Sequence, residues 1–335
     1  MSLDLVDVAV VFQRSGRPPV PAVVGVSIHV GRGAIIGLVG ESGSGKSSLG
    51  KAAVGLVRPH HGEVTFNGKR VQTIGARARP TSQIGLQLVF QNPYGSLNPR
   101  RKVGAQLLDA MKSSITREDR RLRMARLLDQ LGLPADAAAR YPHQFSGGQR
   151  QRVAIARALA ASPSIVVLDE PLAGLDASAQ AQLANLLKRL ATEEHLGMLL
   201  ISHDLAIVRH IADEFAVMYL GVIVETAPTA ELWQLPLHPY SEALIGAIPK
   251  PDGSHQLPVA LPGEVGDPAD PPPGCRFHTR CPYAYERCAT EVPPLLEVAP
   301  GRKVACWLHR PGDELDRSAV QRPHDLGSPL KPNLA

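Results

Sequence analysis

The sequence predicts an α/β fold in which a parallel core sheet carries an N-terminal antiparallel β subdomain, an inserted helical subdomain and a small cysteine-rich C-terminal extension. Three observations support this prediction. Nearly continuous apolar runs alternate with helical patterns, β-branched residues dominate the short runs before residue 72, and residues 100–160 show helical periodicity without strands. Alternation of strand and helix is typical of an α/β core.

The N-terminal runs indicate an antiparallel sheet. Residues 6–12, 27–30 and 62–72 are rich in β-branched side chains, which favour strands. Within the last run, Asn67-Gly68 is the dipeptide preferred in two-residue hairpin turns. We therefore expect these segments to pair as antiparallel neighbours.

Three further runs predict the parallel core sheet. Residues 34–40, 164–170 and 197–202 are almost entirely apolar, as in parallel strands that are buried on both faces. A helical pattern follows each run in turn, in residues 46–56, 178–194 and 205–214.

The segment 100–160 predicts helices only, because its apolar residues recur at helical spacing, as at Val103, Leu107, Leu108 and Met111. It also carries a group of arginines: Arg120, Arg121, Arg123 and Arg126. Such a group fits a solvated helix face or a nucleic-acid surface. The net charge of +5 is modest and its basic residues are scattered, so we favour the solvated face and expect no nucleic acid as partner.

Length and composition limit the other possibilities. With 335 residues, 44% of them hydrophobic, the chain can bury one large core and a smaller appendage, because single cores stop growing near ~250–300 residues. The N-terminus lacks the pattern of a signal peptide, and no stretch approaches the ~18 apolar residues of a membrane span. We therefore expect a cytosolic protein, in which disulfides are rare.

The string GESGSGKS at residues 40–47 predicts a phosphate-binding loop, since it lies between a predicted strand and a predicted helix. Glycines let backbone N–H groups wrap phosphates, a lysine reaches the β and γ phosphates, and a serine hydroxyl can ligate Mg²⁺. A plain glycine-serine turn is the alternative, but it requires neither the lysine nor the flanking elements. The expected ATP-binding residues are Gly40, Glu41, Ser42, Gly43, Ser44, Gly45, Lys46, Ser47 and Ser48.

Two carboxylates, Asp169 and Glu170, end the apolar run 164–170. α/β sheets bind ligands at this edge, so we expect Asp169 to hold Mg²⁺ and Glu170 to polarise the water that attacks the γ phosphate. Such a pair alone is usually a helix cap. The phosphate loop in the same chain favours the catalytic interpretation.

A second glycine-rich segment, residues 145–160, begins with FSGGQ, in which Ser146 can cap a helix. The bare helix end formed by Gly147, Gly148 and Gln149 suits an anion. Because the chain already has one phosphate loop, we expect this end to meet a nucleotide held by another subunit.

With these motifs in order, the chain resembles the ATPase subunits of ATP-binding cassette (ABC) transporters, in which two subunits sandwich two ATP molecules. The resemblance implies that Gln91 is the Q-loop residue that touches Mg²⁺ and the attacking water, and that His203 is the switch histidine at the γ phosphate. It implies that Phe12 stacks on adenine. Asp176 is retained in the loop between the two sites, although Ala173 and Gly174 replace the usual serine and alanine, which removes one hydrogen bond.

Longer strings, among them FQNPYGSLNPR and PPPGCRFHTRCP, resemble the ATPases of oligopeptide and dipeptide permeases. This resemblance implies a cassette in residues 1–249 with its helical subdomain at about 92–160, an extension in 250–320 and a tail in 321–335. It also implies a second ATPase subunit in a heterodimer, two transmembrane permease subunits, an extracytoplasmic substrate-binding protein and a peripheral position at the cytoplasmic face of the membrane. A nickel or sugar importer, a soluble ABC ATPase and a cluster-based redox sensor stay open as alternatives.

All four cysteines, Cys275, Cys281, Cys288 and Cys306, lie in the extension with the spacing C-x5-C-x6-C-x17-C. In a reducing cytosol this group indicates a metal or cluster site. Four thiolates suit an iron-sulfur cluster, whereas zinc sites commonly space two cysteines by about two to four residues. Resemblance to the permease ATPase tail implies a 4Fe-4S cluster, with zinc or plain thiols as alternatives.

Overall fold

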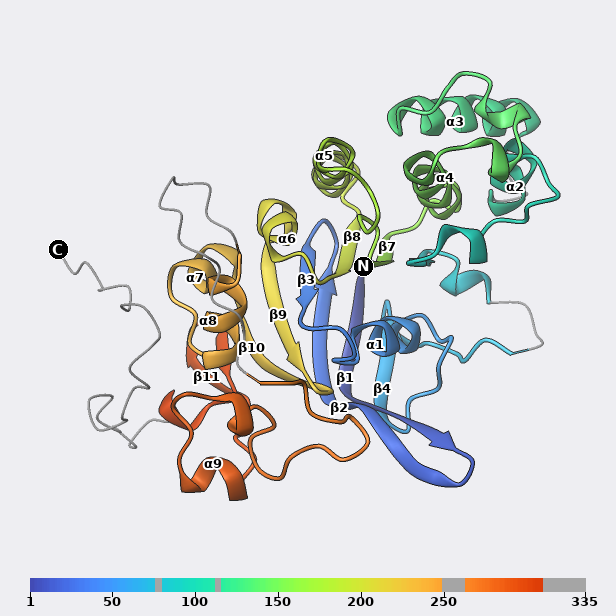
Figure 1. Cartoon of the computed structure of the whole chain (residues 1–335). Helices are drawn as coiled ribbons and strands as arrows, with labels where there is room; N and C mark the ends of the chain where they lie inside the picture. The colour runs from blue at the N-terminus through green and yellow to red at the C-terminus, as the bar shows by residue number, and fades with distance from the viewer. Residues whose placement is uncertain (76–79, 112–115, 249–262, 310–335) are drawn as a thin grey trace.

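The computed structural model describes residues 1–75, 80–111, 116–248 and 263–309 (Figure 1). Two sheets form the centre of the molecule, and the group of helices α2 (Val103–Ala110), α3 (Arg117–Gln130) and α4 (Gly147–Ala160) lies to one side. None of the helices in the described part of the chain is long and apolar enough to cross a membrane. The α/β class with an inserted helical subdomain is confirmed.

The smaller sheet is antiparallel and has the strand order β2-β1-β4-β5. Its strands are β1 (Ser2–Arg14), β2 (Arg17–Gly31), β4 (His61–Phe66) and β5 (Lys69–Arg70). Asn67 and Gly68 both have positive φ, 53° and 71°, as a two-residue hairpin turn requires. The predicted antiparallel sheet and its turn are confirmed.

The larger sheet has eight strands in the order β11-β12-β10-β9-β3-β8-β7-β6. Its central strands β9, β3, β8, β7 and β6 are parallel neighbours. The bounds are β3 (Ile35–Val39), β6 (Leu86–Val89), β7 (Ile165–Asp169), β8 (Gly197–Ser202), β9 (Glu214–Tyr219), β10 (Val222–Pro228), β11 (Leu296–Ala299) and β12 (Arg302–Val304). The three predicted strands, β3, β7 and β8, are confirmed as fully buried neighbours.

A helix follows each of these three strands, as predicted: α1 (Lys46–Ala53), α5 (Ala177–Glu193) and α6 (Leu205–Ile211). The pattern expected to stay helical to residue 214 ends earlier, because Glu214 already begins β9. Helix α1 packs between the two sheets in one apolar core, and α5 and α6 lie on the opposite face of the larger sheet in a second core (Figure 1). Helices α7 (Thr229–Gln234) and α8 (Pro239–Gly246) follow β10.

The helical subdomain is tied together by capping and by one long arginine. Thr116 caps α3 by accepting a hydrogen bond from Asp119 N at 3.1 Å. Arg123 donates to the carbonyl of Leu159 in α4 at 3.1 Å, whereas Arg121 on the same helix is exposed. The arginine group therefore includes both solvated and structural members. The short 3₁₀ helices of the described chain are η1 (Thr81–Gln83), η2 (Pro93–Gly95), η3 (Ala137–Ala139), η4 (Pro142–Gln144), η5 (His278–Arg280) and η6 (Trp307–His309).

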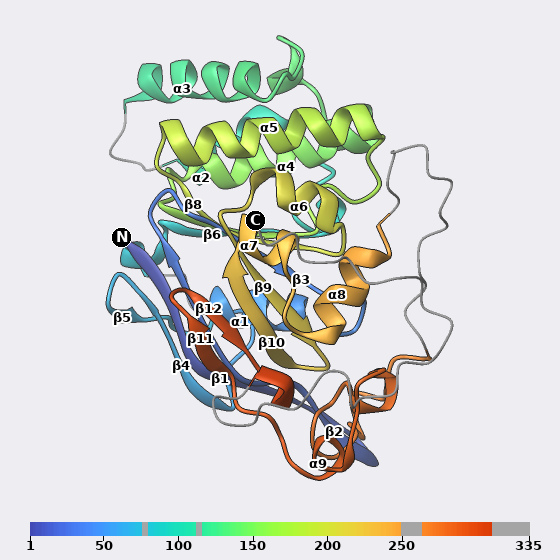
Figure 2. The same cartoon turned by 90° about the vertical axis from the view of Figure 1, so that its left-hand side faces the viewer.

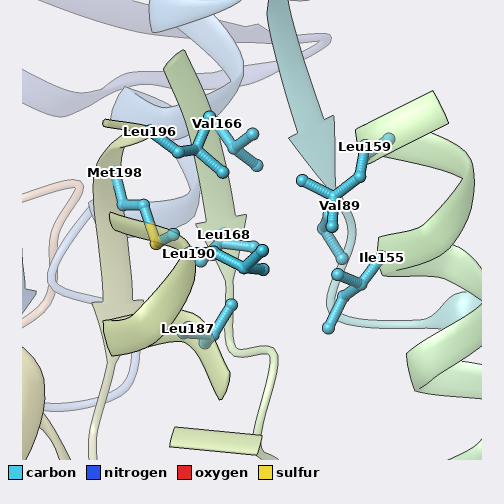
Figure 3. Close-up of a pocket in the computed structure, with 10 residues that line it drawn as sticks. Val89, Ile155, Leu159, Val166, Leu168, Leu187, Leu190, Leu196 and Met198 are labelled. Carbon is cyan, nitrogen blue, oxygen red and sulfur yellow. The ribbon is translucent and has the colours of Figure 1, made fainter. Parts of the chain in front are cut away.

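Figure 3 shows an apolar cavity where the sheet meets α4 and α5, lined by residues such as Val89, Ile155, Leu168 and Met198. Its volume is about 10 Å³, roughly that of a single water-sized sphere. All of its lining residues are hydrophobic, so this cavity is a packing gap in the core and has no room for a substrate.

The C-terminal extension joins the larger sheet. Strand β12 pairs antiparallel with β10, with Glu225 opposite Val304, and β11 pairs with β12. Arg302 of β12 donates to the carbonyl of Leu235 at 2.6 Å and lies 3.6 Å from the fully buried carboxylate of Glu225. Most of the predicted linker, at residues 249–262, lies outside the described residues. The described part of the extension thus shares a sheet with the cassette.

Candidate functional site

Four chain segments bring the predicted catalytic residues to one edge of the larger sheet. Strands β3, β8, β7 and β6 are parallel, so their carboxyl ends lie at the same edge. Lys46 begins the helix after β3, Asp169 ends β7, His203 follows β8, and Gln91 lies two residues beyond β6. Ligands of α/β sheets bind at this edge.

The backbone of the phosphate loop has a shape that only glycine can adopt. Gly40 and Gly45 have φ of 151° and 104°, and a Cβ at either would lie 2.1 Å from a backbone carbonyl oxygen, that of Met218 or of Ala22. Gly43 has φ of 81° but open space around it. Contacts within the chain therefore fix the loop conformation at two of its three glycines.

Lys46 is buried beneath the loop. Its Nζ donates to the carbonyls of Gly40 and Glu41 at 2.7 and 2.8 Å, and lies 3.2 Å from Ser44 Oγ. Burial lowers the pKa of Lys46, while nearby carboxylates, that of Glu170 most strongly, raise it in part. The ammonium group is thus held at the centre of a loop whose backbone N–H groups suit phosphate oxygens.

Ser47 and Asp169 bring two side-chain oxygens together. Ser47 Oγ donates to Asp169 Oδ1 at 2.8 Å, which links the phosphate loop to the end of β7. Burial raises the pKa of Asp169, and the hydrogen bond from Ser47 lowers it. A hydroxyl beside a carboxylate is a donor set that Mg²⁺ accepts.

Glu170 and His203 face each other across the ends of β7 and β8. His203 Nδ1 lies 2.9 Å from both carboxylate oxygens of Glu170, whose side chain is 10% exposed against 64% for His203. Glu170 has φ of 50°, an uncommon value for a residue with a side chain, and its N–H donates to the carbonyl of Ile201 at 2.9 Å. Backbone strain of this kind clusters at functional sites.

The second glycine-rich segment caps α4. Ser146 Oγ accepts a hydrogen bond from Gln149 N at 3.3 Å, and Gln149 Oε1 accepts one from Ser146 N at 3.1 Å. The predicted cap is therefore confirmed, and the reciprocal pair forms a capping box. A Cβ on Gly147 would meet nothing within 4 Å, and one on Gly148 would lie 3.1 Å from Leu175 Cδ2. Ser146 and Gly147 are exposed.

The remaining predicted residues lie on exposed segments. Asp176 caps α5, where its Oδ1 accepts a hydrogen bond from Ala179 N at 2.9 Å. Ala173 and Gly174 just before it are exposed, so a second molecule can reach the loop that they form. Phe12 of β1 is 39% exposed, as a ring available for stacking would be.

Two residues that the sequence analysis missed hold Glu41 of the phosphate loop. Arg280 of the extension donates through Nη1 and Nη2 to its two carboxylate oxygens, at 2.7 and 3.1 Å. The Glu41 N–H donates to the hydroxyl of Tyr240 in α8 at 2.8 Å. Arg280 and Tyr240 lie 239 and 199 residues further along the chain, and no motif marks either position.

The four cysteines lie near one another in the extension and form no disulfide. Burial, together with the smaller effect of the neighbouring Cys281, Cys275 and Cys288, raises the pKa of Cys306 to about 12. Cys275, Cys281 and Cys306 each accept a hydrogen bond from the backbone two residues further on. Even so, among the described residues no group of three or more His, Cys, Asp or Glu side chains is arranged to hold a metal ion.

Together, the loop, the strand-end carboxylates and the inserted helices define a nucleotide-binding cassette. The family described as ABC transporter matches residues 23–173, and that described as oligopeptide/dipeptide transporter, C-terminal region, matches residues 224–288. The chain belongs to the ATP-binding proteins of ABC transporters and carries the C-terminal region of the oligopeptide/dipeptide group.

Individual relatives agree with this assignment. The protein YkfD of Bacillus subtilis, provisionally named an oligopeptide transport ATP-binding protein, is 45% identical over 305 residues, which are 89% of this chain and 93% of the relative. The oligopeptide transport ATP-binding protein AppF of the same organism is 42% identical and covers 87% of this chain and 90% of its own length. Among solved structures, the dimeric cassette MJ0796 bound to ADP and Pi matches with a TM-score of 0.62 and 27% identity, over 68% of this chain and 98% of that one.

Proposed function

We propose that the chain is the ATP-hydrolysing, energy-coupling subunit of an ABC importer for oligopeptides or dipeptides. The observation that carries this proposal is the assembly of Lys46, the Ser47–Asp169 pair and the Glu170–His203 pair at one strand edge. The names of the relatives YkfD and AppF, both oligopeptide transport ATP-binding proteins, support the choice of solute.

The phosphate loop binds the ATP phosphates in this proposal. Backbone N–H groups of residues 40–48 surround the phosphates, and Lys46 turns from its loop carbonyls to the β and γ phosphates. Ser47, Asp169 and Gln91 would hold Mg²⁺, which neutralises charge that develops on the phosphates. Phe12 would stack on the adenine ring.

Hydrolysis is assigned to Glu170 and His203. Glu170 orients and polarises the attacking water at the γ phosphate, and its strained backbone fixes the direction of the carboxylate. His203 Nδ1 contacts both carboxylate oxygens of Glu170. When ATP is bound it can exchange this contact for one with an oxygen of the γ phosphate, so the position of His203 depends on whether the γ phosphate is present.

A second cassette completes the site. Gly147 has open space at its Cβ position and begins a helix whose N-terminus suits an anion, so Ser146, Gly147, Gly148 and Gln149 are assigned to ATP held by the partner. The similar cassette MJ0796 was solved as a dimer. We assign a distinct ATPase subunit as partner, with the exposed loop at Ala173 and Gly174 and the capping residue Asp176 facing it.

The membrane partners follow from the same proposal. The chain acts at the cytoplasmic face of the membrane, where this chain and its partner ATPase dock on two permease subunits, this chain through the exposed surface around Gln91. An extracytoplasmic binding protein delivers the peptide. Importers of nickel or a sugar use the same chemistry in the cassette, because the solute never touches it.

A 4Fe-4S cluster is assigned to the four cysteines. The spacing C-x5-C-x6-C-x17-C has no short interval of about two to four residues, which is common in zinc sites, so zinc is kept as the alternative. A cluster is larger, and each cysteine binds a different iron atom. The mutual electrostatic effect of the four thiols and the backbone hydrogen bonds to their sulfurs support this assignment. No step of ATP hydrolysis passes through the cluster.

The function is tested on the complex of both ATPases, the permease subunits and the binding protein in lipid vesicles. We expect ATP turnover to rise when peptide-loaded binding protein is present, and Lys46→Ala to abolish this rise. Lys188→Ala is the matched control, because Lys188 lies on α5 and donates to the carbonyl of His210 at 3.1 Å. Stimulation by nickel or a sugar in place of peptide would overturn the solute, and turnover indifferent to the membrane subunits would overturn the transporter role.

The cluster is tested by anaerobic purification. A brown protein with about four iron atoms per chain is expected, and a serine at any one of the four cysteine positions should bleach it. A colourless preparation with one zinc per chain would contradict the cluster.

A further inference from the structure

Arg280 makes a direct connection between the cysteine-containing segment and the phosphate loop. It ends η5 (His278–Arg280) and immediately precedes Cys281. Its guanidinium binds both oxygens of Glu41, and the two side chains are only 3% and 20% exposed. A paired geometry of this kind is the strong form of an arginine–carboxylate contact, and burial protects it from screening by salt.

Aromatic rings surround this ion pair. The guanidinium lies 5.8 Å from the ring centroids of both Tyr219 and Phe277, and these rings contact each other edge to face at 5.3 Å. Tyr240 packs against both rings and accepts the hydrogen bond from Glu41 N. Glu41 is therefore fixed at its side chain by Arg280 and at its backbone by Tyr240.

A second arginine of the same segment connects to the loop through the turn between β9 and β10. Arg276 follows Cys275 directly and donates to the carbonyl of Leu220, in the turn between β9 and β10. The next residue, Gly221, donates its N–H to the carbonyl of Ser44 in the phosphate loop at 2.8 Å. Figure 1 and Figure 2 both place the segment around α9 (Glu286–Thr290) beside this end of β9 and β10.

We propose that Arg280 is a positioning residue that orients the phosphate loop through Glu41, so that ATP affinity depends on the order of the four-cysteine site. The carbonyl of Glu41 accepts a hydrogen bond from Lys46 Nζ at 2.8 Å, so a shift of Glu41 changes the direction of the lysine that meets the phosphates. Cys281 fixes the chain next to Arg280. Loss of order at the cysteine site therefore shifts Arg280, and the contacts of Arg280 with Glu41 and of Glu41 with Lys46 pass this shift to the lysine.

This inference rests on the proposed ATP site and is tested separately from it. Binding of Mg-ATP to the full-length chain is measured by titration calorimetry for Arg280→Met in two backgrounds, the natural chain and Glu41→Gln. In the natural background we expect Arg280→Met to raise the Kd about tenfold, the usual size of coupling between two sites. In the Glu41→Gln background the same change should alter the Kd less than twofold. Such non-additivity is the signature of two residues that act as one unit.

Three variants separate the possible causes. Arg140→Met is the matched control, since Arg140 also pairs with a carboxylate, that of Asp136 at 2.8 Å, but within the helical subdomain; its Kd should stay unchanged. Arg280→Lys keeps the charge without the two-point contact and should give an intermediate Kd, and it replaces Arg280→Met if that chain fails to fold. Lys46→Ala reports on the ATP site itself.

The link to the cysteine site is tested with Cys281→Ser, for which the Kd for Mg-ATP and thermal unfolding are measured on the same sample. We expect its Kd to rise about fivefold, and the double variant with Arg280→Met to match Arg280→Met alone, at about tenfold. In the assembled complex the Arg280→Met change should raise KM for ATP while kcat changes less than twofold, because the strand-end residues are untouched.

The outcomes separate the positioning role of Arg280, its link to the cysteine site and the ATP site itself. An unchanged Kd in Arg280→Met, or the same loss in the Glu41→Gln background, overturns the positioning role while Lys46→Ala still abolishes binding. A normal Kd in Cys281→Ser overturns the link to the cysteine site alone. If Lys46→Ala binds ATP normally, the proposed ATP site fails instead.

Discussion

The two glycine-rich segments of the chain, the phosphate loop and the N-terminus of α4, have glycine for different reasons. In the phosphate loop, a Cβ at Gly40 or Gly45 would collide with a backbone oxygen at 2.1 Å. At the N-terminus of α4, Gly147 has no atom within 4 Å of the same position. Contacts within the chain therefore require glycine at these two positions of the phosphate loop. At Gly147 no described atom requires the absence of a side chain, which is consistent with an approaching molecule.

The same contrast holds for the polar groups. Ser47 and Glu170 have hydrogen-bond partners from other parts of the cassette, and Lys46 bonds to carbonyls of its own loop. Ser146 and Gln149 bond only to each other among the hydrogen bonds that the described residues show for their side chains. This contrast supports the proposal that ATP binds through contacts within one chain and that hydrolysis requires a second one.

The largest effect is expected from Gly45→Ala. The new methyl group meets the carbonyl of Ala22 and the methyl group of Met218 at 2.9 Å, and φ of 104° is strained for alanine. We expect the free energy of unfolding to fall by roughly 3 kcal/mol and ATP binding to be lost. Urea unfolding and calorimetry measure both, and a stable, ATP-binding variant would show that the loop shape is not fixed by these contacts.

Glu170→Gln should separate binding from hydrolysis. The amide keeps the size of the side chain but cannot polarise water, so turnover of the complex should fall at least ~100-fold while ATP still binds. Steady-state turnover and nucleotide binding are compared on the same preparation. Near-normal turnover would remove Glu170 from its role.

Gly147→Ala is the matched change at the other segment. Alanine is the better helix former by about 1 kcal/mol, and its methyl group has free space, so the chain should be at least as stable and bind ATP normally. Turnover of the complex should fall about tenfold, because the methyl group occupies the surface for the partner's phosphates. Loss of stability in the isolated chain would break the comparison.

The sequence predicted several elements with strong local patterns, although the apolar strands β9 and β10 were missed. Strands β3, β7 and β8 are apolar throughout because both faces are buried, and Asn67-Gly68 marks its own turn. Strands β6 and β12 escaped prediction because they have only four and three residues and carry polar side chains. Such strands exist through pairing with distant neighbours, which leaves no periodic signal.

The site shows the same division. Lys46 and Asp169 lie in contiguous motifs, so their positions at strand ends followed from the alternation of strand and helix, whereas His203 was assigned from the resemblance to the family. The contact of Arg280 with Glu41 joins residues 239 positions apart. It arises because β12 adds the extension to the core sheet, a pairing that the proline-rich composition before it concealed.

The central claim is that two cassettes complete each other's sites, and Ser146→Arg tests it most directly. ATP binding by the variant chain alone is compared with ATP turnover of the assembled complex. We predict a Kd within about twofold of the natural chain, because Lys46 and its loop lie in a separate part of the fold, together with at least a tenfold loss of turnover at the partner's phosphate loop. Full turnover by the variant complex, or partner-independent turnover by a strictly monomeric chain, would contradict the account.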